Sequence, residues 1–299
     1  MALENLKDKF FQNTFGGFDC SFEKSKFVLL PVPYDLTTSY KSGTREGPQA
    51  IINASINLEF FDAELKKDIS KLGIHTLPFL EQITTSPEKM IATVEEVFNQ
   101  LIEEKKFPVL LGGEHSLTVG SVKSFHKKNP NIAVLQLDAH ADLRDEYQGN
   151  PYSHACVAQR ILDLNIPIRQ VGIRSISEDN FEKMQKTPSQ SLQTFFAKDI
   201  YNSHEWIKEV VDSLPEDVYI TIDLDVFDIS IMPAVGTPEP GGLDWYLVLK
   251  LLTEIVSKKN VIGFDVVELS PIAGNIAPDF LAAKLTYKLL TLIALKKYS

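Results

Sequence analysis

The chain has 299 residues, of which 44% are hydrophobic and 23% are charged, and its formal net charge is −10 at pH 7. This length suits one large α/β domain or two small ones, and it can bury a core without disulfides. The negative charge argues against a nucleic-acid partner, which would need a basic surface. It is compatible with a cationic substrate, although solubility alone is the simpler explanation.

The cysteine count and the N-terminus indicate a cytoplasmic protein. The only two cysteines, Cys20 and Cys156, lie far apart in the sequence, which is typical of a reducing compartment. The first residues carry charges where a signal peptide needs an apolar stretch, and no apolar run is long enough to span a membrane. No linker or repeat divides the chain, so we expect a single domain over 1–299 and no membrane partner.

Short apolar runs alternate with amphipathic segments along the chain. The runs predict strands over 26–32, 108–113, 131–138, 168–173, 192–197, 218–225 and 260–267, with a weaker candidate at 72–77. Helical spacing predicts helices over 88–105, 116–127, 205–213, 244–257 and 279–297, the last of which is apolar around much of its circumference. This alternation indicates an α/β fold with a parallel sheet covered on both faces. In such sheets, ligands bind beyond the carboxyl ends of the strands.

Potential metal ligands follow three of the expected strands. These acidic and imidazole side chains are His115, Asp138, His140, Asp142, Asp223 and Asp225. On an extended backbone every second residue points to the same face. Asp138, His140 and Asp142 would therefore share a face if the extended geometry continued past the strand. Because parallel strands end at one edge of a sheet, all three strand ends can reach a single crevice.

Four crowded carboxylates cannot all stay ionised without a counter-charge. Two divalent cations would supply it, and a set of carboxylates and imidazoles without thiolates suits a fairly hard metal. Mn²⁺ is the first choice, with Zn²⁺, Co²⁺ or Fe²⁺ as alternatives. Each motif taken alone has a structural explanation, because an Asp-x-Asp pair often caps a turn and a single histidine often belongs to the core. The coincidence of three such motifs favours a metal site.

Four sequence blocks resemble the signature motifs of the ureohydrolases, the arginase and agmatinase superfamily. They are GGEHS, DAHADLR followed by SH, IDLDVFD followed by GTPEPGG, and GFDVVELSP. The resemblance implies a three-layer α/β/α fold with a mostly parallel sheet of about eight strands, and two Mn²⁺ ions held by the six residues named above. It also implies hydrolysis of a guanidino compound to urea and an amine, in a homo-oligomer that is a trimer or hexamer.

The resemblance also assigns catalytic roles to three residues. A metal-bridging hydroxide would attack the guanidinium carbon, and Asp142 would take its proton and pass it towards the leaving amine. His154 matches a proton shuttle, and Glu268 matches the carboxylate that holds the guanidinium. Without the resemblance, Glu268 is more simply a solvated charge and His154 a loop histidine.

The segment after the aspartate cluster should help to select the substrate. Arg144, Asn150 and Tyr152 stand where arginases use small polar residues to bind an α-carboxylate. Ser177 stands at the position where arginases have an acidic residue that helps to bind the α-amino group. Both differences favour agmatine, which would yield putrescine and urea. Two positions differ from agmatinases, which often have Thr where this chain has Ala141 and a Thr-Ala pair near Leu281–Ala282. Guanidinobutyrate and arginine therefore remain alternatives.

Two other classes of function compete with this interpretation. A different two-metal hydrolase, such as a phosphoesterase, would need cations near the metals, and Arg144 alone is weak support for one. A non-catalytic relative could keep the fold and the metals as a binding module. Two further expectations concern structure: Arg174 should stabilise its loop or a subunit contact, and Gly112–Gly113 should permit close backbone approach near the metals.

Overall fold

Eight parallel strands form the central sheet of the computed structural model, which describes residues 12–201 and 203–298. They are β1 Phe27–Val32, β4 Ile74–Thr76, β5 Phe107–Gly112, β6 Ile132–Leu137, β7 Ile168–Ile173, β8 Leu192–Phe196, β9 Asp217–Asp223 and β10 Asn260–Val267. Across the sheet their order is β4-β1-β5-β10-β9-β6-β7-β8, and every pairing is parallel. Every expected strand is present, so the prediction of a mostly parallel sheet of about eight strands is confirmed.

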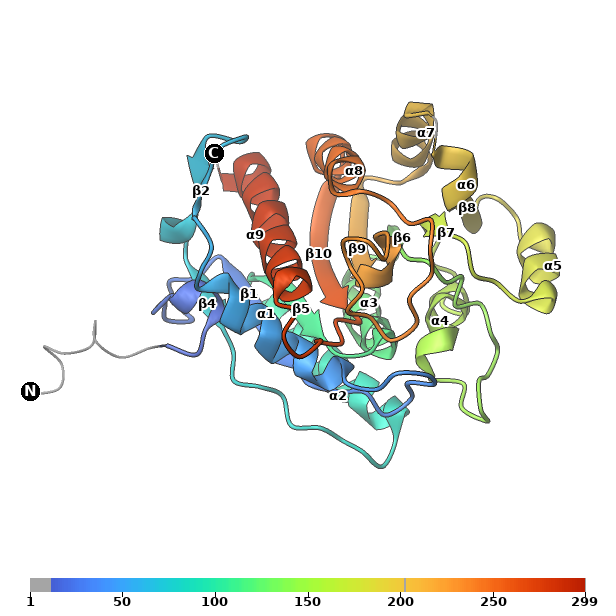
Figure 1. The fold of residues 1–299 in the computed structure, drawn as a ribbon, viewed down its shortest axis with the longest axis horizontal. Coiled ribbons are helices and arrows are strands. Elements are labelled where there is room, and N and C mark those ends of the chain that lie inside the picture. Colours follow the sequence, from blue (N-terminus) through green and yellow to red (C-terminus); the bar gives the residue numbers. More distant parts are fainter. Residues whose placement is uncertain (1–11, 202, 299) are drawn as a thin grey trace, which may run out of the picture.

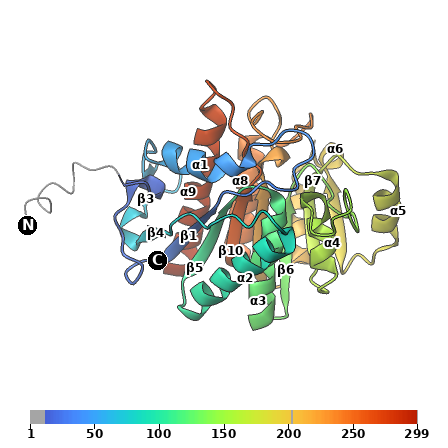
Figure 2. The ribbon, with the colours of Figure 1, turned by 90° about the horizontal axis from the view of Figure 1, so that it is seen from below.

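Helices cover both faces of the sheet (Figures 1 and 2). One face carries α1 Gly47–Ser55, α7 Glu205–Ser213, α8 Trp245–Lys258 and α9 Ala277–Tyr298, and the other carries α2 Pro87–Glu103, α3 Thr118–Lys128 and α4 Val157–Leu162. Successive strand residues point to opposite faces, so Leu29 packs in the first layer and Leu30 in the second. The three-layer α/β/α prediction is confirmed.

The smaller elements lie around this core. Beside the outer strand β8 are α5 Glu178–Lys186 and α6 Ala197–Ile200. An antiparallel hairpin of β2 Phe61–Asp62 and β3 Lys67–Asp68 lies against α9. Short 3₁₀ helices occur at Phe15–Gly17, Thr44–Glu46, Ser70–Leu72, His115–Leu117, His154–Cys156 and Leu224–Val226.

The five helices expected from periodicity are present as α2, α3, α7, α8 and α9. Helix α9 is buried along most of its length, which agrees with its largely apolar circumference. Among the residues that the structure describes, no helix is long and apolar enough to cross a membrane.

Candidate metal centre

The candidate ligands follow the central strands of the sheet. Strands β5, β10, β9 and β6 are successive neighbours, and their carboxyl ends lead into Glu114–His115, Glu268, Asp223–Asp225 and Asp138 respectively. Gly113 lets the segment after β5 pass close to the end of β1, because an added Cβ there would lie 1.9 Å from the Tyr34 carbonyl oxygen. The parallel topology thus gathers residues that are more than a hundred positions apart in the chain.

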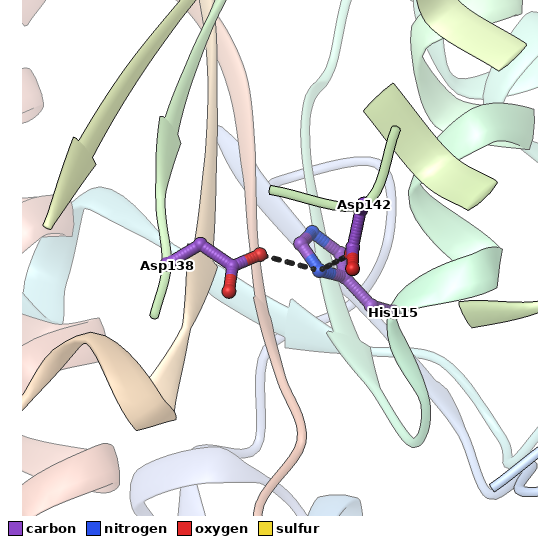
Figure 3. Close-up of side chains that lie close together, drawn as sticks. All are labelled: His115, Asp138 and Asp142. Carbon is purple, nitrogen blue, oxygen red and sulfur yellow. Dashed lines mark ion pairs between the residues drawn. The ribbon is translucent and has the colours of Figure 1, made fainter. Parts of the chain in front are cut away.

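His115 faces three carboxylates. Its Nδ1 lies 3.2 Å from Asp138 Oδ2, 3.3 Å from Asp142 Oδ2 and 3.4 Å from Asp223 Oδ2. Figure 3 shows Asp138 and Asp142 directed at this nitrogen from different sides. The side chain is buried, and Nδ1 has no hydrogen-bond partner among the described residues. An orphaned buried nitrogen among carboxylates fits a bound cation, since burying such a group without a partner is costly.

The opposite side of the His115 ring is held by a hydroxyl. Nε2 lies 2.8 Å from Thr221 Oγ1, which itself donates to Asp265 Oδ1 at 2.6 Å. Because the single hydroxyl proton of Thr221 goes to Asp265, the hydroxyl accepts a hydrogen bond from the Nε2–H of His115. Asp265 is buried and also accepts from Thr118 and Tyr219. This network directs the lone pair of Nδ1 towards the carboxylates, as metal ligation requires.

A second group of candidate ligands shares Asp138 with the first. Asp138, His140 and Asp225 each offer a ligand atom within 4.8 Å of the others. Nδ1 of His140 lies 2.8 Å from Asp225 Oδ2 and 3.7 Å from Asp138 Oδ1. The structure therefore brings all six predicted ligands together, in two adjacent groups joined by one carboxylate. This arrangement fits two neighbouring divalent cations.

The backbone after β6 does not have the expected extended geometry. Strand β6 ends at Leu137, and Asp142 adopts a left-handed conformation with φ of 50°. The expectation that Asp138, His140 and Asp142 share one face was therefore wrong. The chain turns after the strand, so Asp142 approaches His115 while His140 approaches Asp225. All three residues still belong to the cluster, but each contacts a different part of it.

The electrostatics of the cluster favour added positive charge. Burial raises the pKa of Asp138, and the charges of Asp225 and Asp142 raise it further. Burial likewise raises the pKa of Asp223, and the charges of Asp225 and Asp138 raise it further. The carboxylates thus resist ionising together, which is the repulsion that a divalent cation would relieve.

Glu268 lies beside this cluster and lines a cavity of about 270 Å³. It is buried, and its Oε1 accepts a hydrogen bond of 2.6 Å from the backbone N–H of His115. Its own backbone is left-handed, with φ of 68°. Burial raises the pKa of Glu268 and the neighbouring Glu114 raises it further. A cation such as a guanidinium would favour the ionised form of this carboxyl group.

His154 lines the same cavity and is fixed by Thr37. The Thr37 hydroxyl donates to Glu114 Oε1 at 2.7 Å, accepts from the backbone N–H of His154 at 2.9 Å, and lies 3.3 Å from Nδ1 of His154. Since its proton goes to Glu114, this hydroxyl can only accept from Nδ1–H, which leaves Nε2 for other partners. Burial lowers the pKa of His154 and the charge of Asp142 opposes this shift.

The walls of the cavity differ in part from the expectation. Arg144 lines it, with its guanidinium 5.0 Å from the centre of the Tyr147 ring. Asn150 instead accepts from the Tyr152 N–H within a turn, and Tyr152 packs against the helices of the second layer. Neither is among the lining residues, so the arrangement gives no support to their predicted contact with substrate. Ser177 precedes α5 and lines an adjoining cavity.

Six further lining residues were not predicted: Ser39, Tyr147, Ala155, Ser175, Thr237 and Glu239. Thr237 and Glu239 belong to the GTPEPGG block, and Tyr147 lies between Arg144 and His154. The sequence motifs included these three residues, but the sequence did not indicate that their side chains line the cavity. Ser39 comes from the loop after β1, and nothing in its local sequence indicated that this loop reaches the cavity.

Known proteins resemble this chain over most of its length. The model of the Arginase family matches residues 25–291. The N(1)-aminopropylagmatine ureohydrolase of Synechocystis sp. is 37% identical over 277 residues, which cover 90% of each protein. The agmatinase of Pyrococcus horikoshii is 37% identical over 266 residues, covering 87% of this chain and 89% of that protein. The crystal structure of the agmatine ureohydrolase of Thermoplasma volcanium superposes on this chain with a TM-score of 0.89 at 34% identity. The superposition covers 99% of this chain and 100% of that protein.

Proposed function

This chain belongs to the arginase family, and from that premise we propose that it is a metal-dependent hydrolase that releases urea and an amine from a small cationic guanidino compound. The resemblance to ureohydrolases inferred from the sequence motifs is thereby confirmed. One observation carries the proposal beyond the family: residues of both joined ligand groups and the Glu268 carboxylate line a single cavity. The ligands that line it are His115, His140, Asp142 and Asp223. Such a site can hold metals and a guanidinium side by side.

We propose that the site holds two Mn²⁺ ions. His115, Asp142 and Asp223 would serve one ion, His140 and Asp225 the other, and Asp138 both. The orphaned Nδ1 of His115 supports this assignment, as does the absence of thiolates from the set, which suits a hard metal. Divalent ions in such a site lower the pKa of water, which is the chemistry they would supply at neutral pH.

The chain's own residues would carry out the remaining steps. Glu268 would bind the guanidinium in a fork geometry and hold its carbon above the ligand groups. Asp142 reaches into the cavity from a fixed left-handed turn and would transfer a proton to the leaving nitrogen. Since the pKa of His154 is lowered, its imidazole is neutral at pH 7 and its Nε2 would exchange protons with solvent.

Agmatine is our proposed substrate, and urea and putrescine are the products. Its aminopropyl derivative is a second candidate, because relatives named N(1)-aminopropylagmatine ureohydrolase are 37–39% identical to this chain and relatives named agmatinase are 35–37% identical. The derivative is longer and carries one more amine. The resemblance also supports a homo-oligomer, either a trimer or a hexamer, and a cytoplasmic location as proposals.

A substrate panel would test this function. Protein loaded with Mn²⁺ would be incubated with agmatine, aminopropylagmatine, arginine, guanidinobutyrate and a generic phosphate ester. We expect urea from agmatine or its aminopropyl derivative, and no urea after chelation with EDTA. Urea from only arginine or guanidinobutyrate would overturn the substrate while keeping the class. Phosphate release without urea would favour a two-metal phosphoesterase, and inactivity of metal-loaded protein on every compound would favour a non-catalytic relative.

A further inference from the structure

We propose that Glu239 is a specificity residue that pairs with a positive charge in the tail of the substrate. The cavity would then select guanidines that carry an ammonium group at the far end of the molecule. This inference rests on the proposed function, since it assigns the recognition of the tail to the same cavity in which the guanidino group would be cleaved.

Glu239 is the carboxylate of the cavity that has no other task. Asp142 and Asp223 belong to the candidate ligand set, and Glu268 accepts from the His115 backbone. Among the described residues, no Lys, Arg or His nitrogen comes nearer to the Glu239 carboxylate than Nε2 of His140, which lies 4.0 Å from Oε1. The Glu239 side chain is 37% exposed. It is therefore close to the reaction site and free to bind a ligand.

The loop that carries Glu239 is held at Glu239 and at the three residues that follow it. The Arg174 guanidinium donates to the backbone oxygens of Glu239 at 2.8 Å, Pro240 at 3.1 Å and Asp225 at 2.6 Å. The Asp228 carboxylate accepts hydrogen bonds from the backbone N–H groups of residues 241 and 242, at 2.9 and 3.1 Å. Arg174 thus ties Glu239 to Asp225, which confirms the expectation that it stabilises its loop. A loop fixed in this way loses little conformational entropy when Glu239 binds a ligand.

The charges of the cavity match a substrate with two positive groups. Two divalent cations would balance the four carboxylates of the ligand set, which leaves Glu268 and Glu239 as the lining carboxylates that no metal would neutralise. A guanidinium beside Glu268 and an ammonium beside Glu239 would pair both. Arg144 adds a positive charge to the same cavity and lies over the Tyr147 ring. It would attract a carboxylate tail instead, so Arg144 and Glu239 predict opposite substrate preferences.

The test compares two guanidines of equal shape. Agmatine has an ammonium group where n-pentylguanidine has a methyl group. In Glu239→Gln we expect kcat/KM for agmatine to fall about 10- to 100-fold, mainly through KM, which is the range for losing a hydrogen bond to a charged group. For n-pentylguanidine we expect a change of less than about threefold. The matched control Asp145→Asn removes an exposed charge, paired with Lys183, outside the cavity wall, and we expect no change with either substrate.

Further measurements separate this role from its rivals. If Glu239 acted by orienting His140, the variant would bind Mn²⁺ more weakly and lose activity equally on both guanidines, which would overturn the proposal. A wild-type preference for guanidinobutyrate that is lost in Arg144→Gln would overturn it as well. If the wild type cleaves agmatine but Glu239→Gln keeps its KM, only this inference fails. If metal-loaded wild type releases no urea from any guanidine, the proposed function fails with it.

Discussion

Two threonine hydroxyls determine how the histidines of the cavity present their nitrogens. Thr221 donates to Asp265 and accepts from His115, and Thr37 donates to Glu114 and accepts from His154. In each case a buried carboxylate takes the only hydroxyl proton, so the hydroxyl must act as an acceptor towards the histidine. The same arrangement thus serves a candidate metal ligand on one side of the cavity and a candidate proton carrier on the other.

Removing the Thr221 hydroxyl should weaken metal binding. In Thr221→Val the Nε2–H of His115 loses its acceptor, so the ring is no longer held with Nδ1 facing the carboxylates. We expect the affinity for Mn²⁺ to fall about 10- to 100-fold, as is usual when the partner of a ligating histidine is lost. Titration of metal-free protein with Mn²⁺ would measure this, and Thr221→Ser should restore most of the affinity. Unchanged affinity in the valine variant would show that Thr221 does not orient the ligand.

Removing the Thr37 hydroxyl should affect turnover rather than binding. In Thr37→Val the backbone N–H of His154 loses its partner and Nδ1 keeps only Ser153 Oγ, at 3.3 Å, while the candidate metal ligands are untouched. We expect kcat for urea release to fall about tenfold with little change in KM or in Mn²⁺ affinity, given the cost of an unpaired buried polar group. Thr37→Ser should recover kcat. A rise in KM without a fall in kcat would instead indicate that Thr37 contacts the substrate.

At the scale of elements, strand positions were predictable and the turns after them were not. Continuous apolar runs identified all eight strands, and parallel pairing was enough to place their carboxyl ends together. The left-handed turn at Asp142 had no signal, since aspartate is compatible with many conformations. Helix α1 was missed because its short segment lacks a long apolar period, and α5 because it buries no residue fully. Glu239 was visible only as part of a motif, because contacts between distant loops bring it to the cavity.

A buried ion pair joins helix α9 to the β2–β3 hairpin. Lys288 Nζ lies 2.8 Å from Asp62 Oδ2 and also contacts Glu64. Both Lys288 and Asp62 are buried. Lys288→Met should lower the free energy of unfolding by about 3–5 kcal/mol at pH 7, because it leaves the Asp62 charge buried with backbone N–H donors but no neighbouring cation. Chemical denaturation would measure this, with Lys284→Met on the same helix as the matched control and an expected loss below about 0.5 kcal/mol. Equal losses in the two variants would contradict a stabilising pair.

The contribution of this pair should depend on pH in a defined direction. Burial raises the pKa of Asp62, but the hydrogen bond and charge of Lys288, together with hydrogen bonds from the backbone N–H groups of Leu65 and Glu64, outweigh it, so the pKa is lowered overall. Burial lowers the pKa of Lys288 and the two carboxylates reverse this, so it is raised. The stabilisation is therefore complete between the unfolded-state values of about 3.9 and 10.4. It is lost as the pH falls through the native pKa of Asp62 or rises through that of Lys288.

At the scale of the whole molecule, the fold places chemistry at one edge of the sheet and stability in its two apolar layers. Each layer uses alternate residues of the same strands, so the sheet is buried on both faces and only its ends are available for polar clusters. The candidate ligands come from residues 115 to 225, and Glu268 follows the last strand. Every central strand must therefore be in place before the cavity exists.

The central claim is that this cavity hydrolyses a cationic guanidine with two divalent metal ions. It is tested most directly by the rate of urea release from agmatine, measured as metal-free protein is titrated with Mn²⁺. We predict no urea without metal, a rate that rises to its maximum at about two ions per chain, and complete loss with EDTA. Protein that has bound two Mn²⁺ ions per chain and still releases no urea from agmatine or its aminopropyl derivative would contradict the account.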